Sequence, residues 1–160
     1  MPISYDNYMK LDFDEVDIKI LEILRLDGRA SQAMIAKEVN LSPPAVGERI
    51  KKLEQTGVIT GYRAILNPNA FGLDICAYVS IIPQPRHPVT NLVENLEKLQ
   101  EVEEFHAIAG NYSYLIKVRV SSTEELDNFL DKLFMLDGVE RTQTTMVLKT
   151  NVDRPMPLRF

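Results

Sequence analysis

The chain has 160 residues and a mass of 18.2 kDa, which is enough for one ordinary domain or two small ones. A hydrophobic fraction of 45% and a charged fraction of 26% are typical of a soluble globular protein. No stretch approaches the roughly 20 apolar residues of a membrane-spanning helix, so we expect no membrane partner. The formal net charge of -5 argues against a protein that coats nucleic acid by bulk electrostatics.

Two helical patterns come first in chain order. Asp14 can cap the first helix, whose apolar residues recur at helical spacing up to Gly28, where we expect glycine to supply a left-handed C-terminal residue. Ser31 can cap the second helix. Asn40, which tolerates the left-handed conformation, and Leu41 form the break that follows.

A third helix follows at once and begins with two consecutive prolines. Proline inside a helix removes an amide donor and clashes with the preceding turn, but the first helical positions have no intrahelical amide bond to lose. Pro43 and Pro44 therefore mark a helix start, with Ser42 as its N-cap. The helix ends at Gly57, and residues 58–66 are β-branched enough to predict a short hairpin or wing.

Two helices, a tight turn and a capped basic helix follow the order of a helix-turn-helix motif. In this motif the N-terminal residues of the recognition helix contact base edges, while the first-turn amides approach phosphate. We expect Arg49 to read guanine or hold a phosphate, and the other cations to contact the DNA backbone. The residues expected to contact double-stranded DNA are Ser42, Pro43, Pro44, Ala45, Glu48, Arg49, Lys51, Lys52 and Arg63.

Two features of the third helix have alternative interpretations. Residues 42–63 hold four basic side chains against two acidic ones, and such a cluster is also typical of a solvated helix face. The cap, the turn and the two preceding helices favour the DNA interpretation. Gly47, which costs about 1 kcal/mol against alanine in a helix, permits a close approach either to DNA or to the second helix.

From residue 73 onward the apolar pattern alternates, and two further helices are interspersed. The order strand, helix, strand, strand, helix, strand is the ferredoxin-like βαββαβ arrangement, an α+β fold in which both helices cover one face of the sheet. We expect strands over 73–82, 102–109, 112–120 and 139–149, a helix over 92–99, and a helix that Thr123 caps. Out-of-phase apolar residues predict a homodimer with sheets packed face to face. These residues are Tyr78, Ile82, Ile108, Leu115, Met146 and Leu148.

The sequence resembles the leucine-responsive regulatory protein/AsnC (feast/famine) family of transcription regulators over about residues 13–149. The resemblance is carried by FDEVDIKILEILRLDGRAS, IAKEVNLSPPAVGERIKKLEQTGVITGY and FGLD, and in the second half by GNYSYLIKVRV and GVERTQTTMVL. It implies dimers that assemble into tetramers or octamers. The domains that we expect are an N-terminal extension (1–12), a winged helix-turn-helix DNA-binding domain (13–63), a linker (64–72), a ferredoxin-like effector-binding and oligomerisation domain (73–149) and a C-terminal tail (150–160).

The resemblance also implies a site for a small amino acid between dimers. Its candidate residues come from a loop and a strand: Gly110, Asn111, Tyr112, Ser113, Thr142 and Thr144. Family members commonly carry an acidic residue where this chain has Ser113, and a serine hydroxyl makes a weaker, uncharged contact with an ammonium group than a carboxylate does. The alternative interpretation is that the glycine makes a turn and the threonines simply suit a strand.

Patterns typical of catalysis or metal binding are missing from the sequence. His106 is expected mid-strand, His87 lies in a proline-rich link, and Cys76 is the single cysteine, so no nucleophile pair or metal-ligand spacing is recognisable. The start lacks a secretory leader, and we expect a cytoplasmic protein. We therefore expect no enzyme, no metal and no cofactor beyond a possible amino-acid effector. Two rival functions are an amino-acid sensor that acts through protein partners and an architectural DNA-wrapping protein.

Overall fold

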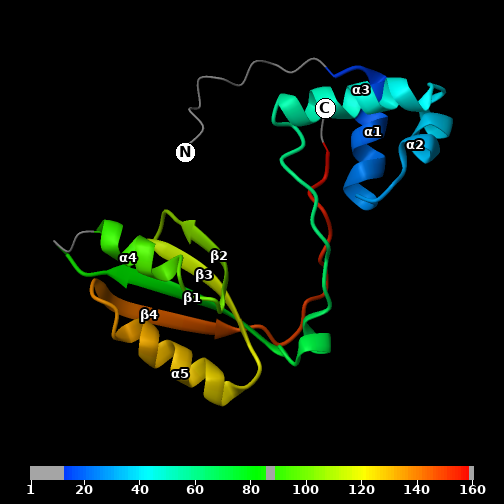
Figure 1. Cartoon of the computed structure of the whole chain (residues 1–160). Helices are drawn as coiled ribbons and strands as arrows, with labels where there is room; N and C mark the ends of the chain where they lie inside the picture. The colour runs from blue at the N-terminus through cyan, green and yellow to red at the C-terminus, as the bar shows by residue number, and fades with distance from the viewer. Residues whose placement is uncertain (1–12, 86–88, 159–160) are drawn as a thin grey trace. The chain divides into compact units, whose positions relative to one another are not determined.

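The computed structural model describes residues 13–85 and 89–158, which divide into two compact units (Figure 1). The helical unit comprises the described residues up to Ile65 together with those from Asp153 onward, and the sheet unit comprises Leu66–Val152. Each unit has its own buried apolar core. Within the described ranges, no helix combines the length and apolarity that crossing a membrane requires.

Three helices build the helical unit. Their apolar residues recur three and four positions apart, so each helix presents one apolar stripe to a shared core. Ile20, Ile35 and Val46 come from successive helices and are fully buried in that core, at 0% exposure. The helices are α1 (Glu15–Leu26), α2 (Gln32–Val39) and α3 (Pro43–Gln55).

The beginnings of these helices confirm the predicted caps. Asp14, Ser31 and Ser42 each accept a hydrogen bond from the amide three residues further along. Asn40, between α2 and α3, is left-handed with φ 53°. The turn between α2 and α3 therefore has the geometry that the sequence predicts.

The end of α1 lies where the sequence predicts it, at Asp27-Gly28, but the predicted left-handed glycine is wrong. Asp27 is the C-cap, and its backbone is extended with φ -136° and ψ 90°. Gly28 is not among the described residues with positive φ. The side chain of Asp27 accepts a hydrogen bond of 2.9 Å from the amide of Arg29, and this local bond turns the chain without a left-handed residue.

The hairpin or wing predicted after α3 does not form a pair of strands among the described residues. Among the described residues from 58 to 66, none belongs to a strand. The amides of Val58 and Ile59 both donate to the carbonyl of Leu53, at 2.9 and 3.0 Å, and so close the end of α3. The chain then continues to a short 3-10 helix, η2 (Pro68–Phe71).

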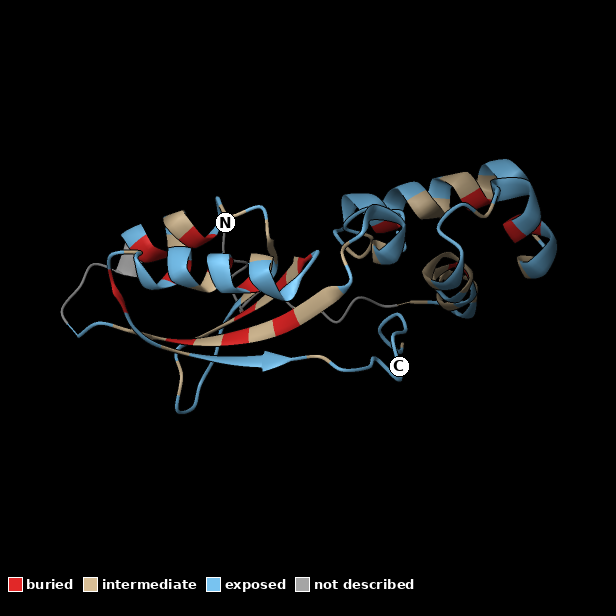
Figure 2. Cartoon of the chain, turned by 90° about the horizontal axis from the view of Figure 1, so that it is seen from below, coloured by how far each residue is buried: buried red, intermediate tan, exposed pale blue. Residues whose placement is uncertain are grey.

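The sheet unit has the predicted order of strands and helices. Its four strands are antiparallel neighbours in the order β2-β3-β1-β4. Both helices cover the same face of the sheet, as the view in Figure 2 shows. The elements are β1 (Ile75–Pro83), α4 (Val89–Leu96), β2 (Val102–Ala107), β3 (Tyr114–Val120), α5 (Thr123–Phe134) and β4 (Val139–Met146). The ferredoxin-like fold is therefore confirmed.

The start of α5 differs from the prediction by one residue. Ser122 is the N-cap and accepts a hydrogen bond of 3.1 Å from the amide of Glu125. The carboxylate of Glu125 accepts in turn from the amide of Ser121, at 2.6 Å. Thr123, which the sequence predicts as the cap, is the first helical residue. Adjacent hydroxyl residues compete for this position, and the backbone of Ser122 is the one that is extended.

The sheet face opposite the helices is less apolar than predicted. Tyr78, Ile82 and Leu115 lie on it, because antiparallel partners project to the same side and these residues alternate with the buried ones. Met146 is paired with the buried Ala77 and so lies on the helix side, and its prediction is wrong. The other two predicted residues lie beyond the strand ends, at Ile108 and Leu148.

An ion-pair network occupies the β2 and β3 part of this open face. The ammonium of Lys117 lies 3.2 Å from the carboxylate of Glu103 and 2.9 Å from that of Glu104. Arg119 pairs with Glu103 as well. These bonds raise the pKa of Lys117, chiefly through its hydrogen bond to Glu104. The charges on this part of the face are therefore matched within the chain.

Candidate nucleic-acid interface and ligand loop

The N-terminal tip of α3 is exposed within the chain. The hydroxyl of Ser42 accepts a hydrogen bond of 3.4 Å from the amide of Ala45. Pro43 and Pro44, at the first two helical positions, are exposed with Ser42. Because both prolines lack an amide hydrogen, the first turn is capped and rigid before it meets any partner. This tip is available to enter a groove.

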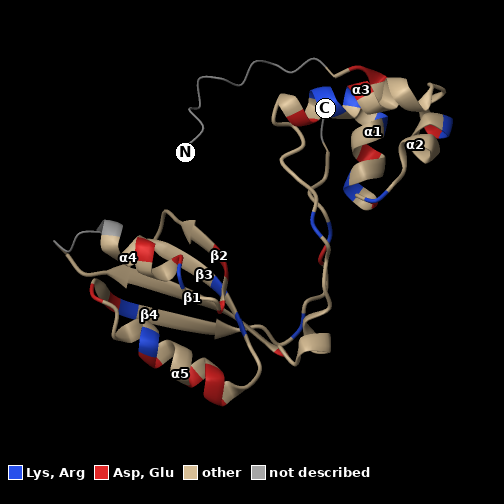
Figure 3. Ribbon diagram, in the orientation of Figure 1, with Lys and Arg blue, Asp and Glu red and all other residues tan. Residues whose placement is uncertain are grey.

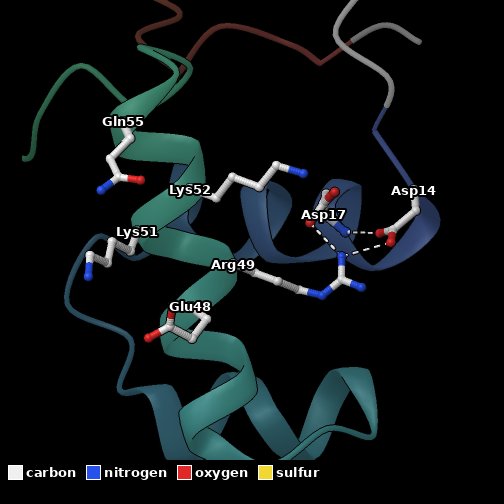
Figure 4. Close-up of a pocket in the computed structure, with 7 residues that line it drawn as sticks. All are labelled: Asp14, Asp17, Glu48, Arg49, Lys51, Lys52 and Gln55. Carbon is white, nitrogen blue, oxygen red and sulfur yellow. Dashed lines mark hydrogen bonds and ion pairs between the residues drawn. The ribbon is translucent and has the colours of Figure 1, made fainter.

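Arg49 does not point freely into solvent. It lies on the side of α3 that faces α1, and its Nη1 lies 2.7 Å from Asp14 Oδ2 and 2.7 Å from Asp17 Oδ1 (Figure 4). The Asp17 side chain is the more buried carboxylate, at 14% exposure against 52% for Asp14. One guanidinium nitrogen therefore fixes α3 to the N-terminus of α1.

Asp14 and Arg49 shift each other's pKa. The amide of Asp17 and the guanidinium of Arg49 both bond the Asp14 carboxylate, and they lower the pKa of Asp14 below its ordinary value. The same carboxylates raise the pKa of Arg49. Asp14 thus has two tasks, since it caps α1 and pairs with α3. The sequence predicts the first task from position, but the second depends on a contact between residues 35 positions apart.

The other residues of α3 that the sequence predicts to contact DNA project in two directions. In Figure 4, Glu48 and Lys51 project away from α1, together with Gln55, which the sequence analysis misses. Lys52 extends over Asp17 on the α1 side. These residues and the acidic pair line one open hollow. Both charge signs occur on α3 in Figure 3, so the field around it is weaker than the count of cations implies.

Arg63 is separate from this group. It lies in the connector after α3, where it is exposed and lines a different hollow with Tyr62 and Asp153. The described structure therefore brings Lys51 and Lys52 together on α3 but does not place Arg63 beside them.

Gly47 faces the second helix. A Cβ built at Gly47 lies 3.0 Å from the side-chain amide atoms of Gln32, the first residue of α2. Of the two predicted reasons for a glycine here, close approach to the second helix is the one that the structure supports. The neighbour is the end of a long side chain, which can move.

The second candidate site lies at the loop between β2 and β3. Gly110 has φ 154° and is exposed, and a Cβ there meets nothing within 4 Å. The amide of Ser113 donates to the carbonyl of Ile81 at 3.1 Å, and its carbonyl accepts from Ile108 at 2.9 Å, so the backbone ties the loop to the sheet. Asn111 and Ser113 themselves are exposed.

The loop and β4 meet through a hydrogen bond between Tyr112 and Gln143, and Gln143 is not among the residues that the sequence predicts for this site. The hydroxyl of Tyr112 donates a hydrogen bond to the side-chain oxygen of Gln143 on β4. Thr142 and Thr144 flank Gln143 but are paired with buried residues of β1, so they project to the helix side of the sheet. The predicted loop and strand are thus brought together, although the hydroxyls of the two threonines lie on the other face. The alternation of side chains along β4 is the only sequence feature from which the side of the sheet that Gln143 faces could have been predicted.

Models of two known families match the chain. One, described as a winged helix-turn-helix DNA-binding domain, matches residues 13–60. The other, described as the Lrp/AsnC ligand binding domain, matches residues 76–157. The second match extends past β4 into the C-terminal segment.

Individual relatives match over nearly their whole length. HTH-type transcriptional regulator FL11 of Pyrococcus abyssi is 38% identical over 143 residues, which cover 89% of this chain and 94% of that protein. HTH-type transcriptional regulator LrpA of Mycobacterium tuberculosis is 36% identical, with 86% and 91% covered.

Solved structures match equally broadly. AsnC of E. coli is 32% identical with a TM-score of 0.84, and the match covers 91% of this chain and 98% of that one. The regulator NMB0573 of Neisseria meningitidis, solved as a complex with L-Met, is 27% identical with a TM-score of 0.88, and the match covers 91% and 97%.

Proposed function

The chain belongs to the Lrp/AsnC family of transcription regulators, and from this premise we propose how it binds DNA and what controls that binding. The tip of α3 enters the major groove of double-stranded DNA, and a small amino acid bound at the sheet unit changes the affinity or the placement of the protein. The protein performs no chemistry and works in the cytoplasm. The observation that carries the proposal is the exposed, serine-capped and proline-started tip of α3.

The roles that we propose on α3 follow from direction and exposure. Ser42, Pro43, Pro44 and Ala45 form the tip that approaches base edges and phosphate. Glu48 and Lys51, which project away from α1, lie on the side that meets DNA. Lys52 and Arg63 contact the sugar-phosphate backbone.

Arg49 holds a phosphate in this proposal while it remains paired with α1. Both ion pairs use Nη1, and a guanidinium carries five N–H donors, so the other edge of the fork can still donate. A guanidinium fixed in this way has lost the freedom to align with a guanine edge. Of the two predicted roles, phosphate contact and positioning of α3 is the one that fits these bonds.

The test is the salt dependence of DNA binding. Lys52→Ala should weaken binding to every duplex by roughly three- to tenfold and reduce the slope of log K against log salt by about one. Lys98→Ala, an exposed lysine of the sheet unit, is the matched control and should leave both quantities unchanged. If Lys52→Ala retained the parent affinity and slope, this lysine would not contact phosphate.

We propose that the effector site is centred on the loop 110–113 and on β4. Tyr112 and Gln143 form its preassembled part, while Gly110 leaves room for a ligand to approach the backbone. Ser113 contributes a hydroxyl and a second copy of the chain completes the site, whereas Thr142 and Thr144 project to the other face of the sheet and are left out of it. L-Met, which the Neisseria relative binds, is the first amino acid to test.

Titration calorimetry tests this site with the 20 common amino acids, beginning with L-Met. Gln143→Ala should reduce effector affinity and leave effector-free DNA binding intact. Gln100→Ala, exposed elsewhere on the sheet unit, is the control. Equal affinity of Gln143→Ala and the parent for the effector would refute the assignment.

The assembly that we propose is a homodimer, built further into a tetramer or octamer. Tyr78, Ile82 and Leu115 give the open sheet face an apolar part, and the neighbouring charges are already paired within the chain, which lowers the cost of covering them. Sedimentation at micromolar concentration tests it. A stable monomer would contradict it.

A further inference from the structure

The C-terminal segment after β4 lies against the helical unit at its far end. Leu158, the last residue described, is partly buried, whereas Leu148, Val152 and Met156 are 95%, 68% and 73% exposed. The described residues from Asp153 onward also group with the helical unit and not with the sheet unit. The chain thus leaves the helical unit after α3, passes through the whole sheet unit and returns.

The groove that receives this segment is built from two parts of the helical unit. Leu21 and Leu24 come from the C-terminal half of α1, and Ile59 and Tyr62 come from the stretch after α3. With Leu158 they line a hollow of about 210 Å³ whose walls are mostly apolar. Met156 and Leu158 form the wall of this hollow that faces α1 and the stretch after α3, so the segment shields apolar side chains there from water.

Charges beside the groove complement those of the segment. Arg25 of α1 and Arg63 line one hollow together with Asp153 and Arg154, and Glu22 and Arg25 line another with Arg154. Among the described residues, the Nε atom of Arg25 is buried without a hydrogen-bond partner. Asp153 therefore shares a hollow with two cations of the helical unit, and Arg154 shares one with Glu22 as well as with Arg25.

The segment is also stiff. Pro155 and Pro157 alternate with Met156 and Leu158, and each proline fixes its own φ. A peptide held extended before it docks loses less conformational entropy than a flexible one. The apolar anchor Leu158, the two cations beside Asp153 and the low entropy cost all favour the same contact.

We propose that residues 153–158 dock in the groove between α1 and the stretch after α3 of their own chain, and act as a second tether on the DNA-binding helices. A unit held through one connector can rotate about it, whereas a unit held through two connectors cannot rotate freely. The segment follows β4 after residues 147–152, and β4 also carries Gln143. The tether thus joins the strand of the proposed effector site to the helices that present α3.

Cross-linking identifies the occupant of the groove. Thr60 and Met156 are both exposed and line the same hollow. Thr60→Cys with Met156→Cys, in a Cys76→Ser background, should form an intrachain link with a short bis-maleimide, while each single-cysteine variant should not. A mixture of isotope-labelled and unlabelled chains separates links within a chain from links between chains. Failure to exceed the single-cysteine controls, or links only between chains, would overturn the proposal.

Hydrogen exchange tests whether the contact has the predicted consequence. Leu158→Asp should speed amide exchange in residues 21–26 and 58–63 by roughly three- to tenfold, because the groove loses its apolar anchor. Leu148→Asp is the matched control, since Leu148 is almost fully exposed. Circular dichroism confirms that both variants fold. Equal protection in the two variants would overturn the proposal. Neither experiment contains DNA or an effector, so its outcome is independent of the regulatory function proposed above.

Discussion

Arg49 forms ion pairs that stabilise the helical unit, and it is also the residue that we propose holds a phosphate of DNA. Its side chain is 33% exposed, and its guanidinium bonds two carboxylates at the start of α1, one of which is largely shielded from water. An ion pair in such an intermediate environment is screened less than a surface pair but carries a smaller desolvation cost than a buried one. The pair therefore holds α3 against the N-terminus of α1, and the same residue lies beside the surface that we propose meets DNA.

Asp17→Asn should destabilise the helical unit by about 1 kcal/mol, since it leaves Arg49 with only the more exposed carboxylate of Asp14. The midpoint of thermal unfolding should fall by roughly 2–4 °C. Calorimetry measures it, and Glu15→Gln in the same first turn is the control, because Glu15 is exposed. If the two variants unfold at the same temperature, the ion pair contributes nothing.

Asp14 gives the helical unit a dependence on acid. Its pKa is lowered in the folded chain by the amide of Asp17 and then by Arg49, so folding favours the ionised form. The resulting stability is present above the pKa of the unfolded chain, about 3.9, and is lost as the pH falls through the lower folded value.

Asp14→Asn should flatten this part of the pH profile of stability, because asparagine still caps the helix but does not titrate. Urea unfolding between about pH 2 and pH 5 measures the difference. A variant that loses stability with acid as steeply as the parent would show that Asp14 is not the group responsible.

At the scale of elements, the beginnings of α1, α2 and α3 are predictable here, whereas α4 begins three residues earlier and α5 is capped one residue earlier than the sequence predicts. A cap such as Ser31 or Ser42 needs only a hydroxyl and the amide three residues later, so the sequence contains all of it. The end of α1 depends instead on which local hydrogen bond forms. Here the side chain of Asp27 accepts one from the amide of Arg29, a bond that the expectation of a left-handed glycine does not include. The missing hairpin after α3 has a similar cause, since Val58 and Ile59 bond to the helix end.

Ser42→Ala should cost about 0.5–1 kcal/mol, toward the low end of the range for N-caps, because the hydrogen bond from Ala45 is long at 3.4 Å. Thermal unfolding should show a midpoint lowered by roughly 2–4 °C. Ser42→Asp, which retains a capping oxygen, should restore stability. Equal midpoints for Ser42→Ala and the parent would mean that the two prolines start the helix without a cap.

At the scale of the whole molecule, the order of elements was predictable because each strand alternates and each helix has one apolar stripe. Ala77, Val79 and Ile81 illustrate this, since all three are fully buried beneath the helices. Contacts between distant segments were not predictable in the same way. The Tyr112 to Gln143 bond and the return of the C-terminal segment to the helical unit depend on the folded chain.

The central claim is that an exposed recognition helix of an Lrp/AsnC regulator binds specific duplex sites and that an amino acid changes this binding. Footprinting on the DNA upstream of the gene for this protein, with and without each amino acid, tests it most directly. We expect protected sites about one helical turn apart, ~34–36 Å, whose protection weakens with salt and changes when the effector is added. Absence of protection at every upstream fragment, or uniform coverage without preferred sites, would contradict it.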